Sequence, residues 1–121
     1  MRITNLAAIL LGAVLVMAWP LVGSAHVHLH KSIPESGESL TEAPKRVEVW
    51  YSGKVDAEWS KIEVTDSNGQ RVDIGKVSRG ENAKHLFVSL KPLAAGDYKV
   101  SLSVIAGDGH RIKDVFSFSI R

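Results

Sequence analysis

Residues 98–104 read Tyr-Lys-Val-Ser-Leu-Ser-Val, so that every second side chain is apolar. A period of two is typical of a β-strand with one face in a core and the other in solvent. The same alternation recurs in shorter stretches, at 26–30, 47–51, 61–64, 86–90 and 116–120. Turn-forming sequences such as Asp66-Ser67-Asn68-Gly69 separate them. The pattern predicts an all-β fold, a small antiparallel Greek-key β-sandwich of six or seven short strands.

The first 25 residues follow a different pattern. Arg2 precedes an apolar run over residues 6–19, and the segment ends in small residues up to Ala25. This order is that of a secretory signal peptide, which is helical and is removed on export. The apolar run is shorter than the roughly 20 residues of a membrane-spanning helix. We therefore predict a signal peptide over 1–25 and one β-sandwich domain over 26–121, periplasmic and without membrane insertion of the mature chain.

The composition of the predicted mature chain limits its partners and its metal chemistry. Of the 15 Lys and Arg residues only Arg2 lies before residue 26, which leaves 14 to set against 13 Asp and Glu. The two signs alternate without forming a block, so we expect no nucleic-acid partner. The chain has no cysteine, and both of its methionines (Met1 and Met17) precede residue 26. Since Cu(I) prefers thiolate or thioether ligands, we expect no Cu(I) site.

Three of the five histidines, His26, His28 and His30, fall at the start of the predicted mature chain. Cleavage after Ala25 would expose the α-amine of His26, whose reference pKa is ~7.7–8.0, so that a metal can displace its proton easily. The amine and the ring Nδ1 of the same residue can then chelate one ion. Asp108 and His110 are two residues apart and share one face of an extended chain. Amine, imidazole and carboxylate ligands suit Cu(II), and the pattern predicts one Cu(II) per chain.

Other interpretations of these residues stay open at this point. The tripeptide His26-Val27-His28 could wrap Cu(II) alone, through its amine, two backbone amides and the third-position imidazole. That geometry would break the pairing of the first strand and expose Val27. His30 and His85 are each interpreted as solvated surface residues, and Asp108 alone would be an ordinary turn former. The histidines at 26, 28 and 30 could also be polar positions on an exposed strand face.

Several marks follow one another in order along residues 26–121. They begin with the histidine that follows the signal peptide and end with a closing Phe-Ser-Phe strand. The full set is His26, Ser32-Ile33-Pro34, Tyr51-Ser52, Pro92-Leu93 with Gly96-Asp97-Tyr98-Lys99-Val100, Asp108-Gly109-His110, and Phe116-Ser117-Phe118. No single mark is specific, but their ordered combination resembles the CopC-type periplasmic copper-resistance proteins.

The resemblance implies a cupredoxin-like or immunoglobulin-like β-sandwich that binds Cu(II) through His26, Asp108 and His110, with His28 as an auxiliary ligand. It also implies a role in copper homeostasis and resistance, beside a membrane copper transporter or other periplasmic copper proteins. The chain departs from the family where a glutamate common after the Tyr-Ser pair is replaced by Gly53. It also has Leu102 where a tryptophan is often found, and it has no methionine-rich loop.

Three functions therefore compete. The first is a non-enzymatic copper(II)-binding protein for storage, buffering or delivery. The second is a copper-dependent oxidase or monooxygenase of the histidine-brace type, which needs an open coordination position and an aromatic substrate face. The third is a β-sandwich interaction module without a metal. The terminal histidine together with the Asp108 and His110 pair favours the first, and we expect no enzymatic activity.

Overall fold

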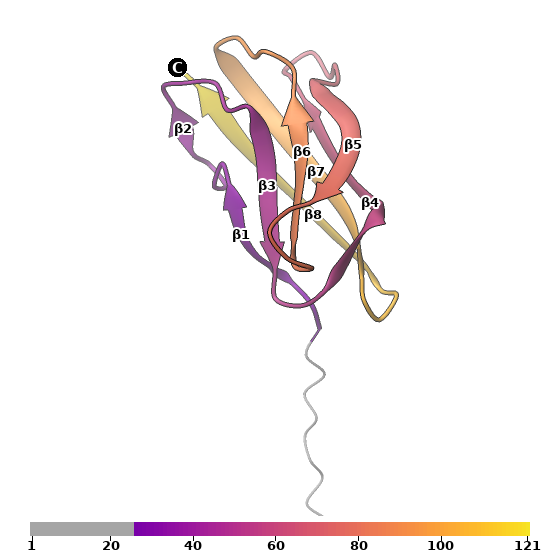
Figure 1. Cartoon of the computed structure of the whole chain (residues 1–121). Helices are drawn as coiled ribbons and strands as arrows, with labels where there is room; N and C mark the ends of the chain where they lie inside the picture. The colour runs from indigo at the N-terminus through magenta and orange to yellow at the C-terminus, as the bar shows by residue number, and fades with distance from the viewer. Residues whose placement is uncertain (1–25) are drawn as a thin grey trace, which may run out of the picture.

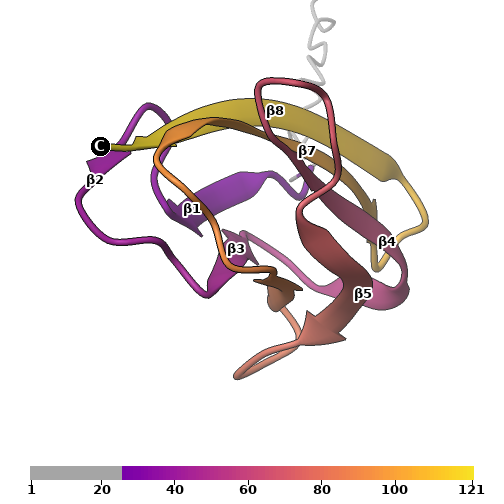
Figure 2. The same ribbon diagram turned by 90° about the horizontal axis from the view of Figure 1, so that it is seen from above.

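The computed structural model describes residues 26–121, in which two four-stranded β-sheets pack face to face (Figure 1). One sheet contains, in spatial order, β1 (Leu29–Ile33), β3 (Arg46–Tyr51), β6 (His85–Leu90) and β5 (Asp73–Arg79). The other contains β2 (Ser39–Leu40), β8 (Arg111–Ile120), β7 (Gly96–Ala106) and β4 (Val55–Thr65). Figure 2 shows the two layers from above. The predicted all-β sandwich is confirmed, with eight strands instead of six or seven.

The strand order follows from repeated crossings between the two sheets. Only the β5–β6 and β7–β8 pairs join neighbours in the same sheet directly, and every other connection crosses to the opposite layer. Pairing is antiparallel except between β2 and β8, which run parallel. The predicted signal peptide lies outside the described residues. Within residues 26–121 no helix is long and apolar enough to cross a membrane.

The core is made of the apolar residues that the alternation singles out. Tyr98, Val100, Leu102 and Val104 of β7 are all buried, in one core cluster to which both sheets contribute. The other members of this cluster are Val47, Val49, Tyr51, Ile62, Val64, Leu86, Val88, Leu90, Phe116, Phe118 and Ile120. At about 25 cal/mol per Å² of apolar surface removed from water, this contact between the sheets is the main favourable term in folding.

The two strands that the alternation does not predict are β2 and β5. β2 has only two residues. β5 contains an irregularity between Asp73 and Val77, where Gly75 adopts a φ of +93°. Extra residues at such a bulge interrupt the period of two, so the pattern is lost although the strand is formed.

One end of the sandwich collects the segments that carry the predicted metal ligands (Figure 1). The start of the described chain, the β3–β4 turn and the β7–β8 hairpin all lie there. Backbone hydrogen bonds tie them together. The amide of Ser52 donates to the carbonyl of His28 over 2.9 Å, and the amide of Gly107 donates to the carbonyl of Lys54 over 2.8 Å. The sheets thus bring residues about 80 positions apart in the sequence to one end of the fold.

Candidate metal centre

Asp108 and His110 lie in the tight turn that joins β7 to β8. The amide of Ala106 donates to the carbonyl of His110, and the amide of Gly109 donates to the carbonyl of Ala106, both over 2.8 Å. Gly109 has a φ of +91°, a left-handed conformation that glycine adopts without strain. The extended chain expected at Asp108 and His110 is wrong, because a turn and not strand alternation sets their geometry.

The turn nevertheless brings the Asp108 and His110 side chains into contact. One carboxylate oxygen of Asp108 accepts the backbone N–H of His110 over 3.0 Å, and the other lies 3.0 Å from its ring Nδ1. The hydrogen bonds from the His110 backbone and ring lower the pKa of Asp108 below its ordinary value. A ring whose Nδ1–H donates to Asp108 carries its lone pair on Nε2, the atom that is then available to a metal.

His26 reaches this hairpin from the other end of the chain. The His26 and His110 ring centroids are 6.2 Å apart, with the rings edge to face. Both rings and Asp108 line a hollow of about 260 Å³. The other residues around it are Val27, Ala106, Arg111 and Ile112. The structure therefore places three of the four predicted ligands around one hollow.

The hollow is not a closed coordination shell in the conformation described. Among residues 26–121 no three His, Cys, Asp or Glu side chains are grouped as they would be around one ion. The His26 nitrogen is part of a peptide bond in the full chain, so its amine chelate can form only after cleavage at Ala25. A metal ion would thus require processing of the chain and a rotation of exposed side chains.

His28, the fourth predicted ligand, is held by the β3–β4 turn and does not line the hollow. Its amide donates to Ser52 Oγ over 2.9 Å, and its ring Nδ1 lies 3.3 Å from the same oxygen. The tripeptide wrap considered in the sequence analysis needs a deprotonated His28 amide. Copper bound in that way would break the hydrogen bond to Ser52, and the fold therefore disfavours this alternative.

The remaining two histidines differ from one another. His30 is exposed at a bulge, where the register of β1 against β3 shifts between Leu29 and Lys31. His85 is 2% exposed, and its interpretation as a solvated surface residue is wrong. Its ring stacks on Trp50 with centroids 4.2 Å apart, and its Nε2 lies 2.9 Å from Glu48 Oε1. The alternation in β6 places this ring on the outer face of its sheet. It is buried there because the loop before β6 covers it.

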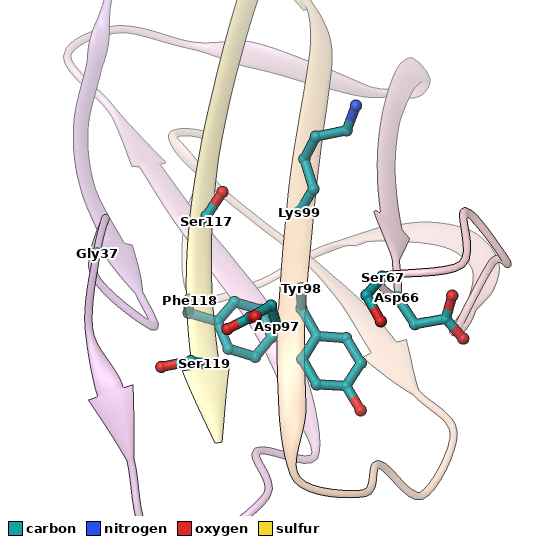
Figure 3. A pocket seen from close by; sticks show the side chains of 9 residues that line it. All are labelled: Gly37, Asp66, Ser67, Asp97, Tyr98, Lys99, Ser117, Phe118 and Ser119. Atoms are coloured by element: carbon teal, nitrogen blue, oxygen red, sulfur yellow. The ribbon is translucent and has the colours of Figure 1, made fainter. Parts of the chain in front are cut away.

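A second hollow at the opposite end of the sandwich lacks metal-binding chemistry (Figure 3). It has a volume of about 390 Å³, and no histidine lines it. Its two carboxylates have other partners. Asp66 accepts the backbone amides of Asn68 and Gln70 within its own turn, and Asp97 pairs with Arg121. These contacts stabilise the turn and the C-terminus, and they make this hollow a poorer candidate metal site than the hollow beside His26.

Ser52 and Gly53 of the β3–β4 turn hold the start of the described chain at the end that carries the candidate site, although the sequence identifies them only through the family resemblance. Ser52 binds both backbone groups of His28. Gly53 lies against Val27, so closely that a Cβ built on it would be 2.7 Å from Val27 Cγ2. The available signal was the turn-forming Ser-Gly pair directly after an alternating strand, but no local pattern shows which distant segment such a turn contacts.

Comparison with known proteins gives a consistent result. The CopC domain model matches residues 29–121. The chain is 33% identical to the copper transport protein CutJ of Bacillus subtilis over 84% of its length, but this match spans only 19% of CutJ. It is 30% identical to protein YobA of Escherichia coli, over 80% of each chain. The crystal structure of CopC from Methylosinus trichosporium OB3b superimposes with a TM-score of 0.73 at 27% identity, covering 78% of this chain and 93% of CopC.

Proposed function

The chain belongs to the CopC domain family, and from that premise we propose that it is a periplasmic copper(II)-binding protein. In this proposal residues 1–25 are removed on export and the mature chain begins at His26. It stores, buffers or delivers copper as part of copper homeostasis and resistance. It is a binding protein and not an enzyme.

The observation that carries the proposal is the meeting of His26 with the Asp108 and His110 hairpin. The two imidazoles come from opposite ends of the domain, yet their centroids are 6.2 Å apart beside a common hollow. After cleavage the amine and Nδ1 of His26 would supply one chelate, and His110 would supply a third nitrogen. With Asp108 this makes an N₃O set, which suits the tetragonal preference of Cu(II). One Cu(II) per chain is the proposed stoichiometry.

Three further parts of the proposal concern His28, the oxidation state of the copper and the protein partners. His28 is an auxiliary ligand at most, since a metal contact would compete with its hydrogen bonds to Ser52. A Cu(I) site is not proposed, because residues 26–121 contain neither cysteine nor methionine. A membrane copper transporter is a proposed partner, and other periplasmic copper proteins are alternatives to it. The match of this domain to about a fifth of the copper transport protein CutJ supports the link to transport.

A Cu(II) titration of two forms of the protein tests the proposal. One form begins at His26, and the other has a single glycine ahead of it, which removes the terminal amine chelate and leaves every side chain in place. Affinity is measured by competition, and the ligand set by electron paramagnetic resonance. We expect the first form to bind one equivalent tightly and the extended form to lose most of that affinity.

Single substitutions separate the alternatives. Asp108→Ala and His110→Ala should weaken binding, whereas His30→Ala, at an exposed bulge, should not. A loss only in His28→Ala would instead support the tripeptide wrap. Equal and weak binding by the two forms of different length would refute the proposed function.

A further inference from the structure

Gly53 lies in close contact with one side chain, that of Val27. A Cβ built on Gly53 would lie 2.7 Å from Val27 Cγ2 and 3.8 Å from both Cβ and Cγ1 of the same side chain. Real Cβ atoms essentially never approach another heavy atom as closely as 2.7 Å. Gly53 does not have a positive φ, so its backbone would accept other residues. Within the described chain, the space taken by Val27 is therefore the constraint that favours glycine here.

Val27 connects the contact at Gly53 to the candidate metal centre. It is the residue next to His26, and it lines the same hollow as His26, Asp108 and His110. Its side chain also packs against the buried core. A β-branched side chain has few rotamers, so Val27 cannot move away from a new methyl group by a small rotation. A displacement of Val27 would carry the backbone of His26 with it.

Ser52, the residue before Gly53, holds His28, the residue after Val27. Its backbone amide donates to the carbonyl of His28 and its hydroxyl oxygen accepts the amide of His28, both over 2.9 Å. Val27 thus packs against Gly53, while two hydrogen bonds to Ser52 hold His28. His26 precedes these two residues, and its ring lies edge to face with that of His110 in the hairpin.

We propose that Gly53 is a positioning residue of the metal centre. Because Gly53 has no side chain, Val27 can pack against it, and Val27 in turn sets the position of His26 relative to the Asp108 and His110 hairpin. This inference rests on the proposed function for its copper readout. Its structural part concerns the metal-free chain alone. The two parts can therefore be tested separately.

The experiment compares Gly53→Ala, Val27→Ala and the double variant in the form that begins at His26, which contains every described strand. Gly53→Ala should raise the Cu(II) dissociation constant about 10- to 100-fold, the range found for residues that hold metal ligands in place. Val27→Ala/Gly53→Ala should recover part of that loss, because the shorter side chain leaves room for the methyl group. Lys54→Ala, at the exposed next position, is the matched control and should bind as the wild type does.

A measurement without metal separates this inference from the proposed function. In the metal-free wild type, nuclear Overhauser contacts should connect the His26 and His110 segments, whose rings are 6.2 Å apart between centroids. They should disappear in Gly53→Ala and return in the double variant, while the core resonances stay unchanged. Unchanged contacts and affinity in Gly53→Ala would overturn the inference, and so would a loss that the double variant does not relieve. Failure of the wild type to bind Cu(II) would overturn the proposed function but not the observed contacts.

Discussion

Replacing Gly80 with alanine should destabilise the domain by about 2 kcal/mol, because the new methyl group would overlap the buried ring of His85. A Cβ built on Gly80 would be 2.6 Å from His85 Cγ and closer still to Nδ1 and Cε1. The ring cannot retreat easily. Trp50 stacks on it at 4.2 Å, and Glu48 accepts its Nε2–H over 2.9 Å.

The expected loss of stability is set by the less costly of two structural responses to the new methyl group. Displacing the ring would sacrifice the stack on Trp50, worth about 0.5–1.5 kcal/mol, and the bond to Glu48, worth about 1.5–3 kcal/mol. Moving the loop that carries Gly80 keeps both contacts. It gives up the hydrogen bond from the Glu81 amide to His85 Nδ1, now 2.9 Å long, together with the close packing. Overpacking of this kind costs about 1–3 kcal/mol, and we take the middle of that range.

Urea denaturation of the form beginning at His26 measures this effect. A loss of about 2 kcal/mol corresponds to a fall in Tm of roughly 8–16 °C for a domain of this size. Gly107→Ala is the control, since a Cβ there would meet Lys54 at an ordinary 3.5 Å. That variant should change the free energy of unfolding by less than about 0.5 kcal/mol, as surface substitutions usually do. If Gly80→Ala stays equally close to the wild type, the packing argument is refuted.

Three further predictions concern buried polar groups, and denaturation at several pH values checks each one. Burial tends to raise the pKa of Asp73, but hydrogen bonds from Arg71 and a backbone amide outweigh it and lower that pKa. Asp73→Asn should therefore cost about 2 kcal/mol at pH 7, and the difference should shrink as the pH falls through the lowered pKa. A difference in stability between Asp73→Asn and the wild type that does not change with pH would contradict this. Burial raises the pKa of Asp114, one of whose oxygens is buried without a partner in the described chain. The folded state then binds the Asp114 proton more tightly than the unfolded state does. The free energy of unfolding therefore falls as the pH rises through the raised pKa, and Asp114→Asn should remove that dependence. Ser60 Oγ accepts the amide of Ile105 over 2.9 Å, so Ser60→Ala should cost about 1–3 kcal/mol, and a neutral effect would mean that water replaces the hydroxyl.

The strands with regular alternation could be predicted from the sequence because one face of each packs in the core. Every second residue of β7 and β8 from Tyr98 to Val104 and from Phe116 to Ile120 is buried, as the pattern predicts. β5 could not be predicted in this way, since it places a carboxylate, Asp73, inside the fold and bulges at the next residues. A buried carboxylate is tolerated there because Arg71 binds it from two residues away and the amide of Val64 donates to it.

The residues of the candidate site stand out in the sequence, but their geometry does not. The histidine at the predicted cleavage site and the Asp108 and His110 pair are visible as a pattern, and the structure places them together. In the sequence, Gly53 stands out only as a departure from the family. Its contact with Val27 depends on the pairing of segments that are far apart in the chain, and no local periodicity contains that information.

The same pairing explains why the fold would matter to a metal ion bound at His26. Fixing the backbone of one residue costs about 1–2 kcal/mol, so ordering residues 26–28 around an ion would cost a peptide about 3–6 kcal/mol. That cost equals two to four powers of ten in affinity. In this chain Val27 and His28 are already fixed by Gly53 and Ser52 before any metal arrives. The hairpin likewise holds His110 against Asp108 in advance. Affinity above that of a histidine-rich peptide would therefore come from this preorganisation more than from the identity of the ligands.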